Sequence, residues 1–157
     1  MPTKTATQSR DESTRKQKVF SDVEQAAARE TARERKRQAK RSPAEERTEG
    51  EAEVREKIAE MPAEDRTIAT RIHEIVAKEA PAFVPRTFYG MPAYARDGKV
   101  VCFFQSKAKF KVRYSTFGFQ PDAKIDDGEM WPVAFAVTDL TPAVASRITE
   151  LVKKAAG

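Results

Sequence analysis

The sequence predicts an α+β fold of two layers, in which helices pack on one face of an antiparallel sheet of about four to five strands. The hydrophobic pattern is helical over residues 51–80, becomes strand-like and rich in aromatic residues from residue 86, and is helical again from residue 142. Three amphipathic helices on one face of a sheet are the simplest arrangement that buries every apolar stripe.

The first two helices of this domain are expected at residues 51–61 and 62–80. Val54, Ile58 and Met61 recur at the spacing of one helix face. The second helix begins with acidic residues, which favour the positive end of the helix dipole. Its apolar stripe consists of Ile68, Ile72, Ile75 and Val76.

The strands are expected to include a hairpin that turns at Asp97-Gly98, between runs at 89–95 and 99–105. Residues 108–117 alternate between apolar and basic side chains, which predicts a third strand with one buried and one basic face. Residues 131–137 predict a further strand, and the proline within it favours a sheet edge.

The chain ends in a helix with clear sequence signals. Thr141 suits the N-cap and Pro142 the first helical position. Two lysines fall in the last turn, where cations are favoured. The apolar stripe consists of Val144, Ile148, Leu151, Val152 and Ala155.

Residues 1–50 are expected to form a basic arm outside this domain, which would span residues 51–157. Residues 1–18 are polar and predict disorder. A capping box at Ser21 and Glu24 predicts a helix that runs to Arg41. Because this helix is polar on every side, the pattern predicts an exposed helix without a docking face.

Charge and cysteine content limit the possible classes of protein. Residues 1–50 hold 13 of the 29 Lys and Arg residues but 9 of the 24 Asp and Glu residues, so most of the net charge of +5 belongs to the arm. Cys102 is the single cysteine, which excludes an intramolecular disulfide. No secretory signal and no membrane-spanning run is evident, so a cytoplasmic location is expected.

Three short motifs together are similar to a known family. They are Tyr89-Gly90-Met91-Pro92-Ala93-Tyr94, Asp97-Gly98-Lys99 and Val101-Cys102-Phe103-Phe104. Residues 51–157 resemble the YdhG-like family, also called domain of unknown function 1801. The resemblance implies helices packed on an antiparallel sheet. Some members are described as frataxin-like iron chaperones, so it also implies iron as a cofactor.

The first of these motifs is the best candidate for a ligand site. Gly90 and Pro92 shape the backbone, and Met91 offers a soft, adaptable contact. With aromatic walls these residues would form a cleft for an organic ligand, although a strand bend packed by core aromatics would have the same sequence. The predicted cleft consists of Tyr89, Gly90, Met91, Pro92, Tyr94 and Trp131.

Two basic sets are candidates for binding a polyanion. The first recurs every four residues along the arm, so it would line one side of a helix and bind nucleic acid or an acidic protein. The second is the basic face of the predicted strand, whose aromatics would point the other way. Solvated charge is the alternative for both. They are Arg29, Arg33, Arg37 and Arg41, and Lys107, Lys109, Lys111 and Arg113.

Acidic residues on the first domain helix are the candidates for a metal. Glu53, Glu56 and Glu60 share one side of that helix, where they would form a loose ridge for a hard cation or simply a solvated face. A single histidine, His73, and a single cysteine cannot supply a zinc site. A pair of His73 with Cys102 stays open as an alternative to an inert buried thiol, but no catalytic residue is predicted.

These features predict a small, non-enzymatic binding or carrier domain, for iron or for a small organic ligand at the aromatic cleft. The alternative is an accessory protein that associates with nucleic acid through its basic arm. A weaker alternative is an enzyme whose acid or base is a carboxylate or a tyrosine. No membrane partner is expected.

Overall fold

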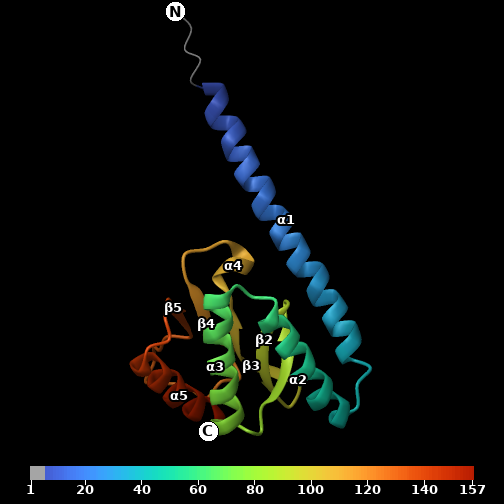
Figure 1. The fold of residues 1–157 in the computed structure, drawn as a ribbon, viewed down its shortest axis with the longest axis vertical. Coiled ribbons are helices and arrows are strands. Elements are labelled where there is room, and N and C mark those ends of the chain that lie inside the picture. The colour runs from blue at the N-terminus through green and yellow to red at the C-terminus, as the bar shows by residue number, and fades with distance from the viewer. Residues whose placement is uncertain (1–5) are drawn as a thin grey trace, which may run out of the picture.

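Five strands form one antiparallel sheet in the computed structural model, which describes the backbone of residues 6–157 and the side chains of residues 22–157. The strands are adjacent in chain order. Figure 1 shows α2, α3 and α5 in front of one face of the sheet, and α1 beside α2. The predicted α+β fold is confirmed. The strands are β1 (Val84–Phe88), β2 (Met91–Arg96), β3 (Lys99–Gln105), β4 (Ser115–Phe119) and β5 (Ala134–Val137), and the helices are α1 (Ala6–Gln38), α2 (Pro43–Ala59), α3 (Ala63–Glu79), α4 (Lys107–Phe110) and α5 (Pro142–Ala156).

Two tight turns join the first three strands. Asp97 and Gly98 have φ values of 52° and 77°, as a two-residue hairpin turn requires, so the hairpin predicted there is confirmed. Tyr89 and Gly90 form a second such turn, with φ values of 51° and 72°. The strand predicted from residue 89 therefore begins at Met91, and an unpredicted strand, β1, precedes the turn.

Helix α2 begins earlier than the sequence pattern predicts. Ser42 accepts a hydrogen bond from the backbone of Glu45, whose side chain accepts one in return, and this capping box starts the helix at Pro43. The domain boundary expected at residue 51 therefore falls inside α2. Gly50 is required in this helix because a Cβ there would overlap the carbonyl oxygen of Pro85 in β1.

Helix α1 docks on the domain, contrary to the expectation of an exposed arm. The Gln38 side chain donates to the backbone oxygen of Thr87 in β1 at 3.0 Å, and Glu34 accepts from the backbone N–H of Gly90 at 2.6 Å. Polar side chains can dock here because they satisfy backbone groups at the exposed edge of β1 and at its turn. The helix includes residues 6–18, where disorder was expected, because Gln, Arg, Lys and Glu favour helix. Residues 1–5 lie outside the described residues.

The strand predicted at residues 108–117 is wrong over most of its length. Ser106 caps the short helix α4 by accepting from the backbone N–H of Ala108, and Lys111 ends it in a left-handed conformation with φ 53°. Strand β4 starts only at Ser115. Two lysines of the alternating pattern, Lys107 and Lys109, instead pair with acidic residues of α3 and α1.

The remaining predicted elements agree with the structure. Thr141 caps α5 and Pro142 begins it. Strand β5 is the sheet edge, although it starts at Ala134 rather than residue 131. The core lies between the sheet and the three helices that cover it. Its fully buried side chains include Val54, Ile72, Val76, Tyr94, Phe104, Phe117 and Val152.

Candidate ligand pocket

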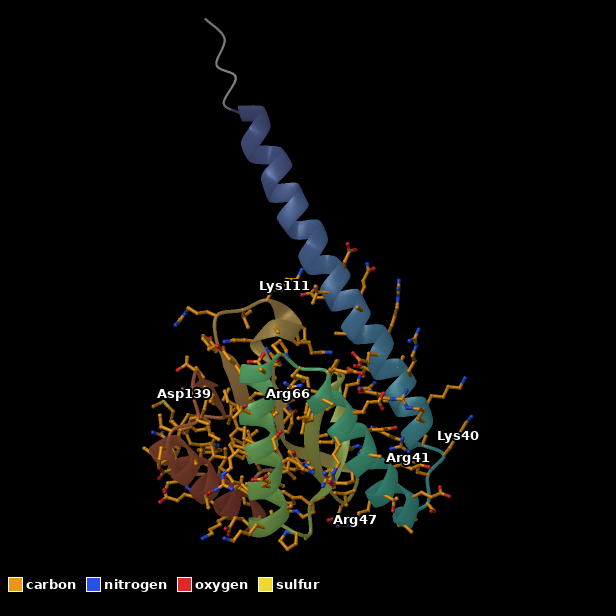
Figure 2. The ribbon with its side chains drawn as sticks, in the orientation of Figure 1. Lys40, Arg41, Arg47, Arg66, Lys111 and Asp139 are labelled. Atoms are coloured by element: carbon orange, nitrogen blue, oxygen red, sulfur yellow. The ribbon has the colours of Figure 1, made fainter. Side chains whose placement is uncertain are left out.

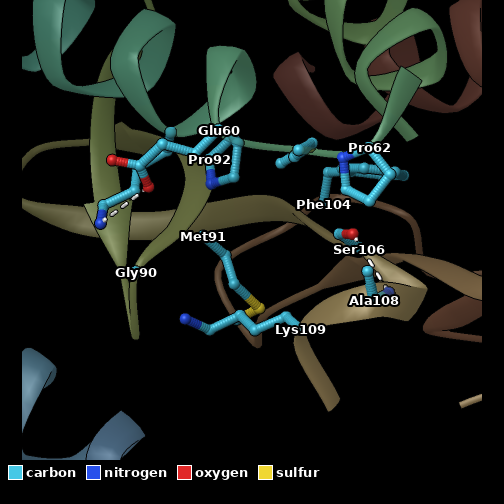
Figure 3. Close-up of a pocket in the computed structure, with 11 residues that line it drawn as sticks. Glu60, Pro62, Gly90, Met91, Pro92, Phe104, Ser106, Ala108 and Lys109 are labelled. Carbon is cyan, nitrogen blue, oxygen red and sulfur yellow. Dashed lines mark hydrogen bonds and ion pairs between the residues drawn. The ribbon is translucent and has the colours of Figure 1, made fainter. Parts of the chain in front are cut away.

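A pocket of about 250 Å³ opens where α4 and the β1–β2 turn meet the connection between α2 and α3. Figure 3 shows Met91 and Lys109 on one side of it and Pro62, Phe104 and Ser106 on another. The walls are mostly apolar, and the polar groups gather at the rim and at one point of the wall. The pocket is lined by Lys57, Glu60, Met61, Pro62, Gly90, Met91, Pro92, Phe104, Ser106, Ala108 and Lys109.

The turn at Tyr89-Gly90 places the next two residues in the pocket wall. Because both turn residues adopt positive φ, the chain reverses within two residues and β2 starts directly at Met91. Met91 and Pro92 are both buried, as is Phe104 on the neighbouring strand β3. Regular strands therefore fix the apolar floor of the pocket, which favours a preformed site over a mobile one.

A buried carboxylate holds α4 against α3 beneath the pocket. Asp65, which is only 1% exposed, accepts hydrogen bonds from the hydroxyls of Ser106 and Ser115. The Ser115 hydroxyl in turn accepts from the backbone N–H of Lys107 at 3.0 Å. This network fixes the start of α4 and therefore the positions of Ala108 and Lys109 at the pocket wall.

Two lysines at the rim converge on one carboxylate from α1. Glu30 accepts from the Lys57 ammonium at 2.8 Å through Oε1 and from the Lys109 ammonium at 3.0 Å through Oε2. Burial alone would raise the pKa of Glu30, but the hydrogen bonds from the two lysines outweigh it and lower the pKa. Glu30 is therefore ionised at neutral pH, and it forms a charged cluster with two lysines that line the pocket.

Glu34 lies one helical turn beyond Glu30 and is buried against the same backbone turn. Its Oε1 accepts from the Gly90 N–H at 2.6 Å. Burial raises the pKa of Glu34, and the charge of Glu30 raises it further, although the Gly90 hydrogen bond acts in the opposite direction. Gly90 thus contacts both carboxylates: its N–H donates to Glu34, and a Cβ at this position would overlap the carboxylate of Glu30.

The structure brings only part of the predicted aromatic cleft together. Gly90, Met91 and Pro92 line the pocket. Tyr89 instead packs edge-on against Phe88, with ring centroids 4.7 Å apart. The two remaining aromatics are not in the pocket wall: Tyr94 is buried in the core and Trp131 packs against the core from the segment before β5.

Sequence reasoning missed most of the opposite wall. Met61 was assigned to a helix stripe and Lys109 to a strand face, and Lys57 was not singled out at all. Helical spacing relates Lys57 to Met61 at the end of α2, but it cannot bring Lys109 of α4 to them. A useful signal was Ser106 before Lys107, a capping residue at the start of a short helix.

The two predicted basic sets do not form a common surface. On α1, Arg29, Arg33 and Arg37 are exposed, although Arg37 also pairs with Glu53 at 3.5 Å. Arg41, just after α1, pairs with Glu49 and Glu53. Figure 2 shows Arg41 at the α1–α2 connection, far from Lys111 beside α4.

Within the second set, the lysines of α4 have acidic partners. Lys107 pairs with Glu64 at 2.8 Å, and Lys109 with Glu30. Lys111 and Arg113 are exposed in the segment between α4 and β4, where the Arg113 guanidinium lies 5.3 Å from the ring centroid of Tyr114. The continuous basic face that the sequence predicted is therefore not present in residues 107–113.

The acidic residues of α2 do not converge as a metal site requires. Glu53 is bound by Arg41, and its second oxygen is buried without a hydrogen-bond partner. Glu60 pairs with Lys57 at 3.5 Å, and Glu56 is exposed. Within residues 22–157 no three metal-binding side chains gather at one point. The donor set on this helix therefore does not fit a bound iron ion.

His73 belongs to a buried hydrogen-bond chain. Its Nδ1 lies 2.9 Å from the Tyr94 hydroxyl and its Nε2 lies 2.7 Å from Glu51 Oε1. Both ring nitrogens are thus engaged, so neither is available to activate Cys102. Burial raises the pKa of the Cys102 thiol far above its ordinary value, as expected for an inert thiol.

A larger groove of about 650 Å³ lies between the α1–α2 connection and the β2–β3 hairpin. Four arginines line it, and three of them, Arg41, Arg86 and Arg96, are bound by other groups of the protein. Arg86 donates to the Gly98 backbone oxygen at 2.9 Å, and Arg96 donates to the Ala156 backbone oxygen at 2.9 Å. These arginines therefore brace the fold, and the smaller pocket remains the better candidate site.

Comparison of the chain with protein-family models, with curated proteins and with solved structures found no match. The resemblance to the YdhG-like family stays a prediction. No helix within the described part of the chain has the length and apolar character needed to cross a bilayer.

Proposed function

We propose that this chain is a small-ligand-binding domain whose site is the pocket between α4 and the β1–β2 turn. The observation that carries the proposal is the combination of a preformed apolar wall with two ammonium groups at the rim. Apolar walls with a few placed polar groups are the usual composition of sites for organic ligands. The proposal keeps the cleft hypothesis but replaces its tyrosines and Trp131 with Met61, Phe104 and the two lysines.

Binding, rather than catalysis, is the proposed activity because the polar groups of the pocket already form hydrogen bonds or ion pairs with other groups of the protein. The Ser106 hydroxyl donates a hydrogen bond to the Asp65 carboxylate. Burial alone would lower the pKa of Lys57, but the hydrogen bond and charge of Glu30 raise it, so Lys57 is a charged ammonium rather than a nucleophile. Iron does not enter the proposal, since the acidic residues of α2 do not converge.

A substitution that fills the pocket tests this function. Ala108 lies in the pocket wall and is exposed, so Ala108→Trp is expected to block the cavity without disturbing the core. Ala143→Trp on the exposed side of α5 is the matched control. A panel of small organic compounds is screened by thermal denaturation, because a specific ligand stabilises the native state by mass action.

Compounds that bind the pocket should raise the melting temperature of the wild type and of the Ala143→Trp control but not that of Ala108→Trp. At a concentration of about 100 times Kd the stabilisation is about 2.7 kcal/mol, which is easily detected. Compounds that stabilise the Ala108→Trp variant as much as the wild type would place ligand binding elsewhere and would refute the proposal.

A second candidate function is nucleic-acid association through α1. The observation that favours it is the exposure of Arg29, Arg33 and Arg37 on α1, of which Arg37 also pairs with Glu53 of α2 at 3.5 Å. Binding is expected to be insensitive to sequence and to weaken steeply with salt, because each phosphate contact releases counterions. Fluorescence anisotropy with the triple alanine variant tests it: binding that this variant retains would contradict it.

A further inference from the structure

We propose that the ligand of this pocket is a small carboxylate, and that Glu30 of α1 is its intramolecular competitor. This inference rests on the proposed function and adds the ligand class and the control of access. Its basis is the position of the Glu30 carboxylate, which lies over Gly90 and bridges two lysines that come from different elements. Glu30 thus occupies the place that a ligand's carboxylate would take.

The geometry at the rim suits a carboxylate specifically. Lys57 on α2 contacts one oxygen of Glu30 and Lys109 on α4 contacts the other, at 2.8 Å and 3.0 Å. A glycine beneath them leaves room for the carboxylate group, since a Cβ at residue 90 would overlap it. Two ammonium groups that converge on the two oxygens of one acid form a charge-assisted site for that group.

The apolar wall determines the size and chemical character of the rest of the ligand, beyond its carboxylate. Met61, Met91 and Phe104 line the cavity directly beside the two lysines. Its volume of about 250 Å³ is below the roughly 300–1,000 Å³ of common drug-sized sites. A short aliphatic or monocyclic aromatic carboxylate therefore matches both the charge at the rim and the space behind it.

The contacts that hold helix α1 on the domain are mostly polar, which allows the Glu30 side chain to leave the two lysines. The docked face of α1 consists of polar groups at the sheet edge, among them Glu34 and Gln38, whereas α2 buries Val54 and Ile58 in the core. Burial and the charge of Glu30 raise the pKa of Glu34, so the ionised form of its carboxyl opposes docking. Segments held by few apolar contacts open at low free-energy cost.

Competition predicts a specific coupling between ligand and helix. A ligand that needs the lysines binds only when Glu30 has left them. Its apparent affinity is therefore the intrinsic affinity multiplied by the fraction of molecules in which Glu30 has left the lysines. Removing the Glu30 carboxylate should therefore tighten the binding of carboxylates. The matching amides, which have the same shape without the charge, should gain much less.

The test titrates benzoate, phenylacetate and hexanoate, each with its amide, into the full chain by calorimetry. Glu30→Ala is compared with Glu24→Ala, which removes the same charge from an exposed position of the same helix. Glu30→Ala should bind at least one carboxylate about fivefold to tenfold more tightly than wild type, in the range of common coupling energies. Amide affinities should change by less than about twofold, and Glu24→Ala should behave as wild type.

Two further measurements keep the result interpretable. Glu30→Gln removes the charge but keeps the shape of the side chain, so it should tighten binding in the same direction if the alanine variant folds poorly. Saturating carboxylate should also speed amide hydrogen exchange in residues 22–38 of wild type, because ligand and docked helix exclude each other.

Carboxylate affinity that is unchanged or weaker in both Glu30 variants would overturn the competitor role. Carboxylates that bind no better than their amides in every variant would overturn the ligand class. Neither result refutes the pocket itself, because neutral compounds whose stabilisation is lost in Ala108→Trp would still support the proposed function. Failure of the function is recognised separately, when no compound depends on Ala108.

Discussion

Glu30 and Glu34 lie one turn apart on α1, yet their surroundings move their pKa values in opposite directions. Two lysines surround Glu30, and their hydrogen bonds lower its pKa despite burial. Glu34 is buried, and its hydrogen bond from the Gly90 N–H is not enough to offset the loss of hydration, so its pKa is raised. The ionised form of Glu34 is therefore a cost to the folded state at neutral pH.

Replacing Glu34 with glutamine is predicted to raise the melting temperature at pH 7 by about 1–3 °C. The amide oxygen can still accept from Gly90, while the buried charge is removed. Because the folded pKa of Glu34 lies above its unfolded value near 4.5, the penalty is present above the folded pKa and is lost as pH falls toward the unfolded one.

Melting curves at pH 7 and pH 4 check this prediction, with Glu24→Gln at an exposed position of α1 as the control. The advantage of Glu34→Gln over wild type should shrink at pH 4. An advantage that is absent at pH 7, or that grows at pH 4, would show that the Glu34 carboxylate does not oppose folding.

Single residues also show where sequence reasoning reaches its limit. The Gly90-Met91-Pro92 segment was predicted as a site because its residue types restrict the backbone, and that restriction is local. Tyr94 was assigned to the same cleft and does share a strand face with Pro92, but it lies two residues further along β2, where its hydroxyl meets His73 of α3 in the core. Where along a strand the covering helices leave a pocket depends on how those helices pack, and no short motif encodes this.

At the scale of elements, α4 shows how tertiary contacts override a local pattern. Alternating lysines and apolar residues favour a strand in isolation. Instead, Ser106 caps a helical turn and is bound to the buried Asp65 of α3, while Lys107 and Lys109 reach Glu64 and Glu30. These partners lie far away in the sequence, so the alternation alone could not reveal them.

Removing the Ser106 hydroxyl is predicted to destabilise the protein by about 1–3 kcal/mol, the usual cost of leaving a buried polar group without its partner. The Ser106→Ala variant would leave Asp65 with Ser115 as its remaining hydroxyl donor and would remove the cap of α4. Urea denaturation measures the change, with Ser146→Ala on the exposed side of α5 as the control. Equal stability of the two variants would contradict the anchoring role of this cluster.

Helix α1 is the opposite case, because its helical structure was predicted but its docking was not. Its helical character follows from composition and was predicted from residue 21 onward. Its docking did not follow, because the apolar stripe that normally signals a packed helix is missing. Polar side chains at Glu34 and Gln38 replace that stripe by bonding to backbone groups of the β1–β2 hairpin. Such docking depends on where the sheet leaves backbone groups unpaired, which only the assembled fold determines.

At the scale of the whole molecule, the candidate site lies where four segments distant in the sequence meet. The α2–α3 connection supplies Met61, the first hairpin supplies Met91, α4 supplies Lys109, and α1 supplies Glu30, which pairs with two lysines of the wall. The α+β class and most helices followed from hydrophobic periodicity. The pocket did not, because it depends on how the two layers and α1 are placed together.

The most direct test of this account uses the methionine methyl groups as probes. Met61 and Met91 line the pocket, whereas Met130 is 89% exposed on the loop before β5. The protein is labelled at its methionine methyls and titrated with the tightest-binding carboxylate of the panel, while carbon–proton NMR spectra are recorded. We predict saturable shifts of the Met61 and Met91 methyl signals, an unchanged Met130 signal, and loss of the shifts in Ala108→Trp. Shifts confined to Met130, or shifts that persist in Ala108→Trp, would contradict the assignment of this pocket as the binding site.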